Sequence, residues 1–128
     1  MELTQLIERT LGLAFLLIGL SHAAQPARWG ELFADVLAKP HGALLIATLS
    51  LPLALVLVVG HPGWTPDGRS VVTLYGWLLL AKCAAYLLVP GVSRRVVPAT
   101  LHTGRGFRPA GAVMVALGAV VLHASLGA

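Results

Sequence analysis

Charged residues are scarce in this chain of 128 residues, and 57% of its residues are hydrophobic. Lysine, arginine, aspartate and glutamate together make up 11% of it, against about 25% in soluble domains. The one cysteine, Cys83, excludes a disulfide framework and a thiolate metal cluster within the chain. The sequence also lacks a phosphate-binding loop, a nucleophile–base set and a dinucleotide fingerprint. We therefore predict no catalytic residues, no metal site and no enzymatic activity.

Long apolar segments are what the chain has instead, and they occupy residues 6–24, 42–60, 71–89 and 110–127. A hydrocarbon core about 30 Å thick needs roughly 20 such residues in a helix. The connecting segments are too short to build a second hydrophobic core. The sequence therefore predicts an all-α fold, a four-transmembrane-helix bundle that forms a single integral membrane domain over residues 1–128.

Loop charges predict the orientation of this bundle. Four crossings put both termini on one side of the membrane and residues 25–41 and 90–109 on the other. The basic residues of these two loops are Arg28, Lys39, Arg94, Arg95, Arg105 and Arg108. Only Arg9 and Arg69 fall on the opposite side, so the positive-inside rule makes the two loops cytoplasmic and both termini periplasmic in a bacterial inner membrane. We assign the net charge of +4 to contact with lipid head groups, not to a nucleic-acid partner.

The leader before the first span does not resemble a signal peptide. It carries Glu2, Glu8 and only Arg9, where a signal peptide has a positively charged region. We therefore expect residues 6–24 to be retained as a helix. Glu8, at the outer edge of this span, is the only carboxylate predicted within the membrane segments. This scarcity argues against proton- or sodium-coupled transport, which usually needs acidic residues in the membrane.

The two halves of the chain resemble each other. A shift of 64 residues aligns Gly12 with Gly76, and a shift of 69 aligns residues 42–57 with residues 111–126. Each half then consists of a membrane helix, a proline, a short interfacial segment and a second membrane helix. This predicts two parallel repeats about a pseudo-two-fold axis along the membrane normal. The alternative is chance alignment of segments rich in leucine, alanine, glycine and valine.

Residues 27–39 predict an amphipathic interfacial helix. Its apolar stripe includes Trp29 and Phe33, and its opposite face carries charges, with Asp35 and Lys39 spaced for an ion pair. We expect this helix to lie on the cytoplasmic membrane surface with its rings in the acyl boundary. Folding back onto the bundle as a cap is the alternative. The counterpart at residues 91–102 is weaker because a proline interrupts it.

Small residues spaced two turns apart predict which helix faces touch, because lipid tails give leucine no reason to prefer another helix. The residues in this arrangement are Gly12 and Gly19, Gly76 and Cys83, and Gly111 and Gly118. Close contacts within the bundle and a homodimer face are both consistent with this spacing.

Lys82 is the most unusual residue of the predicted spans. A lysine near the middle of a span costs about 2.5–3.5 kcal/mol on insertion scales and usually faces a partner or a cavity. Pro52 lacks an N–H group and leaves the carbonyl of Thr48 without its helical donor, at nearly the same depth. We therefore predict an intramembrane polar site in which Lys82 donates to the Thr48 carbonyl and the Ser50 hydroxyl. Snorkelling of the lysine to the interface is the alternative.

Two histidines and a tryptophan mark the outer leaflet. His61 ends the second span, His123 lies about one turn inside the outer end of the fourth, and Trp64 suits an interfacial belt. Two histidines on facing helices are able to ligate a b-type haem. Neither histidine has a histidine or glutamate companion at helical spacing, so we expect no cofactor and keep haem b as the alternative.

The chain resembles a family of small, uncharacterised four-span bacterial membrane proteins. The residues that carry the resemblance are Leu11-Gly12, Gly19-Leu20, Pro26, Trp29, His61, Trp64, Thr73, Gly76-Trp77, Lys82 and Pro90. The chain is also similar, more loosely, to DoxX-like four-helix proteins, some of which are membrane subunits of quinone-linked redox systems. Pro62-Gly63, and Cys83 in place of a glycine, depart from the family pattern. The resemblance implies the four-helix fold and carries no established activity.

These observations favour a non-enzymatic accessory or assembly subunit of a larger inner-membrane complex. A homo-oligomeric channel or transporter for small molecules or anions, with Lys82 along its path, is the second interpretation. A redox subunit that binds haem or quinone is the third. The expected partners are the lipid bilayer and other membrane subunits or further copies of this chain.

Overall fold

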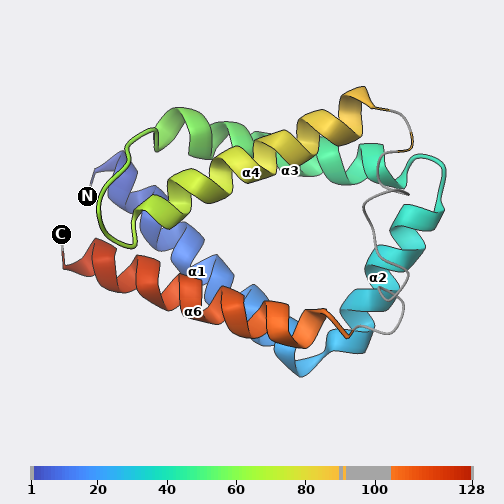
Figure 1. Cartoon of the computed structure of the whole chain (residues 1–128), viewed down its shortest axis with the longest axis horizontal. Helices are drawn as coiled ribbons and strands as arrows, with labels where there is room; N and C mark the ends of the chain where they lie inside the picture. Colours follow the sequence, from blue (N-terminus) through green and yellow to red (C-terminus); the bar gives the residue numbers. More distant parts are fainter. Residues whose placement is uncertain (1, 90, 92–104, 128) are drawn as a thin grey trace.

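The computed structural model describes residues 2–89, 91 and 105–127, and its regular structure there is entirely helical. The helices are α1 (Leu3–Ala24), α2 (Pro26–Ala38), α3 (Gly42–Gly60), α4 (Ser70–Leu88) and α6 (Phe107–Leu126) (Figure 1). Helices α1, α3, α4 and α6 are long and apolar enough to cross a membrane. The predicted fold class is confirmed, and the chain is a multi-pass membrane protein.

The helix ends follow the local sequence. Helix α2 has Pro26 at its first position, where a proline loses no hydrogen bond, and Pro40 follows its end. Helix α3 continues through Pro52. Helices α1 and α6 each begin three residues before the predicted spans, at Leu3 and Phe107.

The four spans are arranged as two antiparallel pairs. Helix α1 packs along α6, and α3 packs along α4, whereas contacts between the pairs are few. The pairs meet at the end that holds both termini and the loop of residues 61–69, which we name the closed end (Figure 1). They separate toward the end where α2 lies, which we name the open end (Figure 1). Both termini lie at one end, as four crossings require, while the side of the membrane that they face stays a prediction.

Glycines set the distance between α1 and α6. An added Cβ atom would lie 2.8 Å from the Gly111 oxygen at Gly19 and 2.5 Å from the Gly19 oxygen at Gly111. At Gly118 it would lie 2.7 Å from the oxygen of Gly12. The two backbones are therefore in direct contact, which is possible only without side chains at these positions. The predicted small-residue contacts form inside the bundle.

The second pair uses slightly larger residues for the same purpose. Gly76 of α4 lies against Leu57 of α3, where an added Cβ atom would be 2.8 Å from the leucine Cβ atom. Cys83 is fully buried in a cluster with Ala47 and Ala54. A thiol therefore fills the place that a glycine fills in α1.

The pairing is the one that a duplication requires. A two-fold axis that exchanges α1 with α4 and α3 with α6 also exchanges the pair α1–α6 with the pair α4–α3. Gly12 packs on Leu122 as Gly76 packs on Leu57. These contacts relate the first helices by a shift of 64 residues and the second helices by 65, one helical turn less than the predicted 69. The predicted interfacial counterpart at residues 91–102 lies, apart from Gly91, outside the described residues.

Helix α2 packs against the ends of α1 and α6. The Trp29 ring stacks on His22 of α1 with centroids 4.2 Å apart, and its Nε1 donates to Ser21 Oγ at 2.9 Å. Phe33 stacks on Phe107 of α6 at 5.7 Å. The two rings are thus used within the protein, so the predicted insertion of these rings into the acyl boundary is wrong. The alternative, in which the helix folds back as a cap, is the observed arrangement.

A single methyl group at Gly111 tests the contact between α1 and α6. Because the nearest atoms are backbone and cannot rotate away, we expect Gly111→Ala to lower the free energy of unfolding by about 1–3 kcal/mol. Gly106→Ala is the matched control, since its Cβ atom would meet nothing within 4 Å. Equal unfolding midpoints for both variants in a detergent titration would contradict this packing.

Candidate functional site

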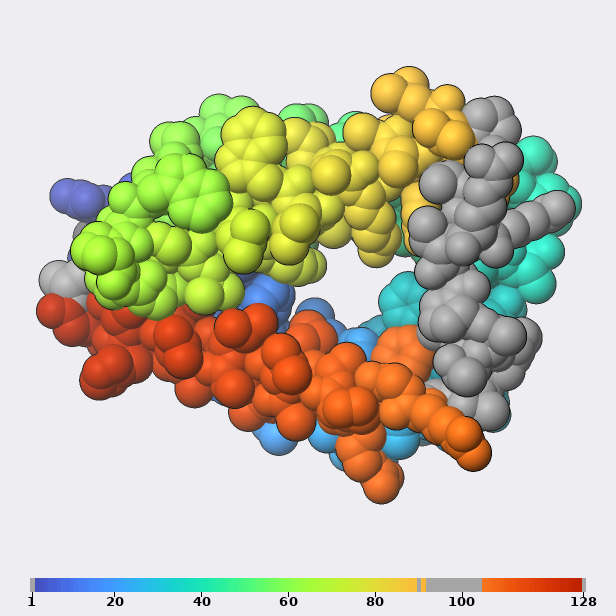
Figure 2. Space-filling view, in the orientation of Figure 1, coloured from blue at the N-terminus to red at the C-terminus, as the bar shows by residue number. Residues whose placement is uncertain are grey.

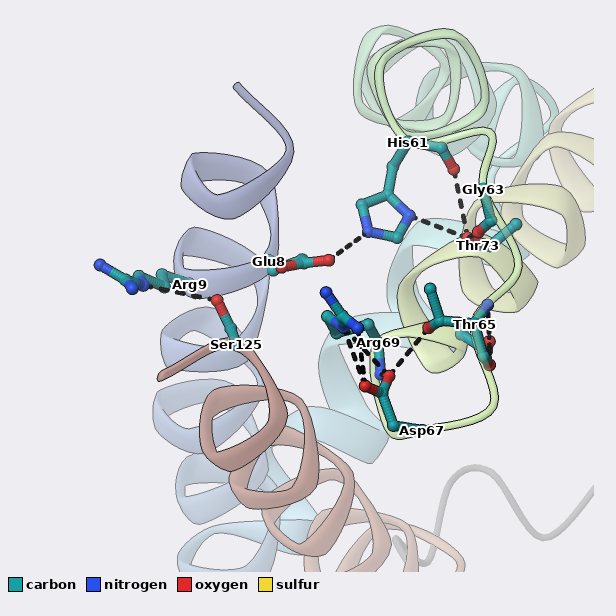
Figure 3. A network of polar contacts seen from close by, with 10 residues as sticks. Glu8, Arg9, His61, Gly63, Thr65, Asp67, Arg69, Thr73 and Ser125 are labelled. Atoms are coloured by element: carbon teal, nitrogen blue, oxygen red, sulfur yellow. Dashed lines mark hydrogen bonds and ion pairs between the residues drawn. The ribbon is translucent and has the colours of Figure 1, made fainter. Parts of the chain in front are cut away.

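A buried polar network joins the two helix pairs at the closed end. Glu8 comes from α1, His61 directly follows α3, and Thr73 lies in the first turn of α4. Their exposed fractions are 2%, 3% and 1%, so the three side chains are shielded from both water and lipid. We name these three residues the polar clamp (Figure 3).

Hydrogen bonds occupy both ring nitrogens of His61. Nε2 lies 2.7 Å from Glu8 Oε2, and Nδ1 lies 2.8 Å from Thr73 Oγ1 (Figure 3). The Thr73 hydroxyl donates to the carbonyl of Gly63 at 2.6 Å and, at 3.2 Å, to that of His61. No polar side-chain atom in the described part of the core lacks a partner.

These distances fix where the protons lie. The Thr73 hydroxyl has one proton, which goes to the carbonyls, so Oγ1 must accept from His61 and Nδ1 must carry a hydrogen. The short contact at Nε2 then has two forms. Either an imidazolium donates to an ionised Glu8, or a protonated Glu8 donates to a neutral ring. Both forms carry the same number of protons and no net charge, which suits an apolar environment.

The loop that follows His61 covers the clamp. Asp67 accepts from the Arg69 side chain at 3.0 and 3.1 Å and from its backbone N–H at 3.0 Å. These bonds, with one from the Thr65 hydroxyl, hold the pKa of Asp67 well below its usual range. The bond to Asp67 raises the pKa of Arg69, and the charge of Glu8 contributes less. Ser70 closes the loop by hydrogen bonds with the backbone of Thr65.

A core built from all four spans lies directly beneath the clamp. It contains Ile7, Leu11, Phe15, Leu57, Val72 and Val121. Phe15 of α1 meets Tyr75 of α4 edge to face, with ring centroids 4.8 Å apart. Arg9 Nε donates to Ser125 Oγ at 3.4 Å and ties α1 to α6 at the same level. Polar and apolar contacts between the pairs are therefore concentrated at one end.

The structure does not form the predicted hydrogen bonds of Lys82. Thr48 is exposed on α3, because Ala47 and Ala54 are the residues that face α4. Lys82 has no hydrogen bond to Thr48 or Ser50, and its Nζ atom lies 5.9 Å from the centroid of the Tyr86 ring. The predicted intramembrane site is thus wrong in its partners, although Lys82 itself stays of interest.

The predicted haem ligands are not brought together either. Both ring nitrogens of His61 are occupied by Glu8 and Thr73, whereas His123 is exposed on α6. Trp64 is exposed in the loop of the closed end, a position that suits the predicted interfacial belt. Among the described residues, no group of three or more histidine, cysteine, aspartate or glutamate side chains is placed to hold a metal ion.

The sequence gives two weak signals for the clamp that we did not use. Glu8 is a carboxylate inside a predicted span, and His61 ends another span at the same side of the membrane. An ionisable residue in a span usually has a partner at its own depth. Comparison with known proteins adds nothing to this: no family model, curated protein or solved structure matches the chain. The resemblance to small four-span proteins therefore stays a prediction.

Substitutions of Glu8 test the proton arrangement in the clamp. We expect Glu8→Ala to destabilise the protein by about 3–5 kcal/mol, because it leaves a buried ring nitrogen without a partner. Glu8→Gln should cost clearly less, since its amide donates to Nε2 of a neutral His61 ring. The measurement is the free energy of unfolding in mixed micelles, and equal losses for both variants would contradict the assignment.

Proposed function

We propose that the protein is a non-enzymatic accessory subunit of a larger complex in the bacterial inner membrane, and that α2 carries its docking surface. The observation that supports this is a stripe of four exposed charged residues along α2. We name this stripe, which consists of Arg28, Glu31, Asp35 and Lys39, the charged stripe.

The spacing of the stripe places it on one side of the helix. Its members follow one another at intervals of three, four and four residues, which keeps them within one helical face. The apolar side of α2 is occupied by contacts with α1 and α6 through Trp29 and Phe33. The charged stripe therefore faces away from the bundle, where another protein has access to it.

The charges of the stripe are not satisfied within the described part of the chain. Arg28 donates to the Gln25 side chain at 2.8 Å, and the predicted ion pair between Asp35 and Lys39 is absent. A stripe with both signs fits a protein surface with the complementary order of charges. An anionic lipid surface fits it less well, because it would repel Glu31 and Asp35. We therefore place a protein partner at this surface.

Photo-crosslinking in living cells tests the proposal. A benzoylphenylalanine residue at position 31 should yield a discrete crosslinked product larger than the chain, identified by mass spectrometry. The matched control carries the same probe at Glu2, which is exposed at the opposite end of the bundle.

Charge reversal at a second position provides the specificity test. We expect Asp35→Lys to reduce the crosslink at position 31 at least about tenfold, which corresponds to about 1.4 kcal/mol, without changing the thermal midpoint of the purified chain. A crosslink that survives Asp35→Lys, or one that appears equally from position 2, would contradict docking through the charged stripe. So would crosslinks to this same chain alone.

A further inference from the structure

Lys82 lies on the side of α4 that faces the other helix pair. It is seven residues, or about two turns, after Tyr75, so both project from the same face. The Tyr75 ring contacts Phe15 of α1, which fixes the direction of that face. Lys82 therefore points toward the α1–α6 pair, at the level where the pairs have begun to separate.

An opening lies between the pairs at this level. Figure 2 shows it bordered by α4, α6 and α2, with no described side chain filling it. Tyr75 is partly buried near the closed end, whereas Lys82 is exposed. On α1, Ile18 lies one turn beyond Phe15 toward the open end and is 40% exposed. The opening thus combines an amine with apolar walls.

The amine of Lys82 is directed toward the open end. Its Nζ atom lies over the ring of Tyr86, which is one turn further along α4. Tyr86 is two residues before the end of the helix at Leu88, a rise of about 3 Å. The flexible lysine stem therefore brings the charge close to the depth of the lipid head groups, and the direction agrees with the snorkelling alternative.

No carboxylate of the chain is placed to neutralise this amine. Glu8 is bonded to His61 and Asp67 to Arg69, both at the closed end. Residues 90–104 contain neither aspartate nor glutamate. In the described part of the chain, Tyr86 provides the sole polar or aromatic contact of the Lys82 amine. A cation between apolar walls needs a counter-ion, and here it has to come from outside the chain.

We propose that the opening holds one anionic phospholipid, whose phosphodiester oxygens accept hydrogen bonds from Lys82 and whose acyl chains lie between the two helix pairs. Charge complementarity supports this occupant. Lys39 and Arg108 lie at the same end, and Arg108 is anchored by its bond to the Ala23 carbonyl at 3.3 Å. A lipid supplies both the anion and the apolar chains that such an opening requires. A soluble anion supplies only the first.

Native mass spectrometry of the full chain tests this binding site. The protein is reconstituted in nanodiscs that contain equal amounts of phosphatidylglycerol and phosphatidylcholine, and released into the gas phase. We expect one retained phosphatidylglycerol in the wild type, retention in Lys82→Arg, and about tenfold weaker retention in Lys82→Gln. Lys39→Gln is the matched control, because it removes a lysine from the same end but outside the opening, and it should retain the lipid.

Three results would overturn the proposal. They are equal retention in Lys82→Gln and the wild type, equal loss in Lys82→Gln and Lys39→Gln, and retention of phosphatidylcholine as readily as phosphatidylglycerol. Circular dichroism and the thermal midpoint in the same nanodiscs establish that each variant is folded. Crosslinking through the charged stripe does not depend on Lys82, so the lipid site and the docking surface fail or succeed separately.

Discussion

The hydrogen bond between Glu8 and His61 connects one helix pair to the other, and the shape of the molecule follows from where it lies. Within each pair, α1 and α6 or α3 and α4 are in contact along their length through small residues. Between the pairs, the described contacts concentrate at the polar clamp and the core directly beneath it. Two rigid pairs joined at one end are free to part at the other, and Figure 1 shows them doing so.

Burial explains why such a polar connection is compatible with a membrane. An isolated charge at this position would be costly, but the clamp distributes one mobile proton between a carboxyl group and a ring without creating net charge. Thr73 contributes by giving its own proton to backbone carbonyls, which forces the orientation of His61. The loop with Asp67 and Arg69 then covers the network from the side of the terminus. Each polar group thereby has a defined partner.

The chain sequence was sufficient to predict the elements but not their rotation. The four spans, the amphipathic segment and the glycine contacts all depend on composition and helical period, which are local properties. The proposed bond between Lys82 and Thr48 was based on depth, which a sequence also provides. It failed because packing turns Ala47 and Ala54 toward α4 and leaves Thr48 on an exposed flank.

The polar clamp was missed for a related reason. Its members lie up to 65 residues apart, and neither Glu8 nor His61 has a partner at helical spacing, so no local pattern reveals them. Knowing that the two pairs exchange under a two-fold axis would have placed α1 against the start of α4. The duplication suggested by Gly12 and Gly76 was therefore the most useful long-range signal in the sequence.

Electron–electron distance measurements in nanodiscs test the central claim, that the pairs are joined at one end and parted at the other. Spin labels on a Cys83→Ala background would be placed at Leu74 and Val120 near the closed end, and at Leu88 and Arg108 near the open end; these four positions are exposed. The account requires a longer distance for the second pair of labels than for the first, and a broader closed-end distribution in Glu8→Ala. Equal separations at both ends, unchanged by Glu8→Ala, would contradict it.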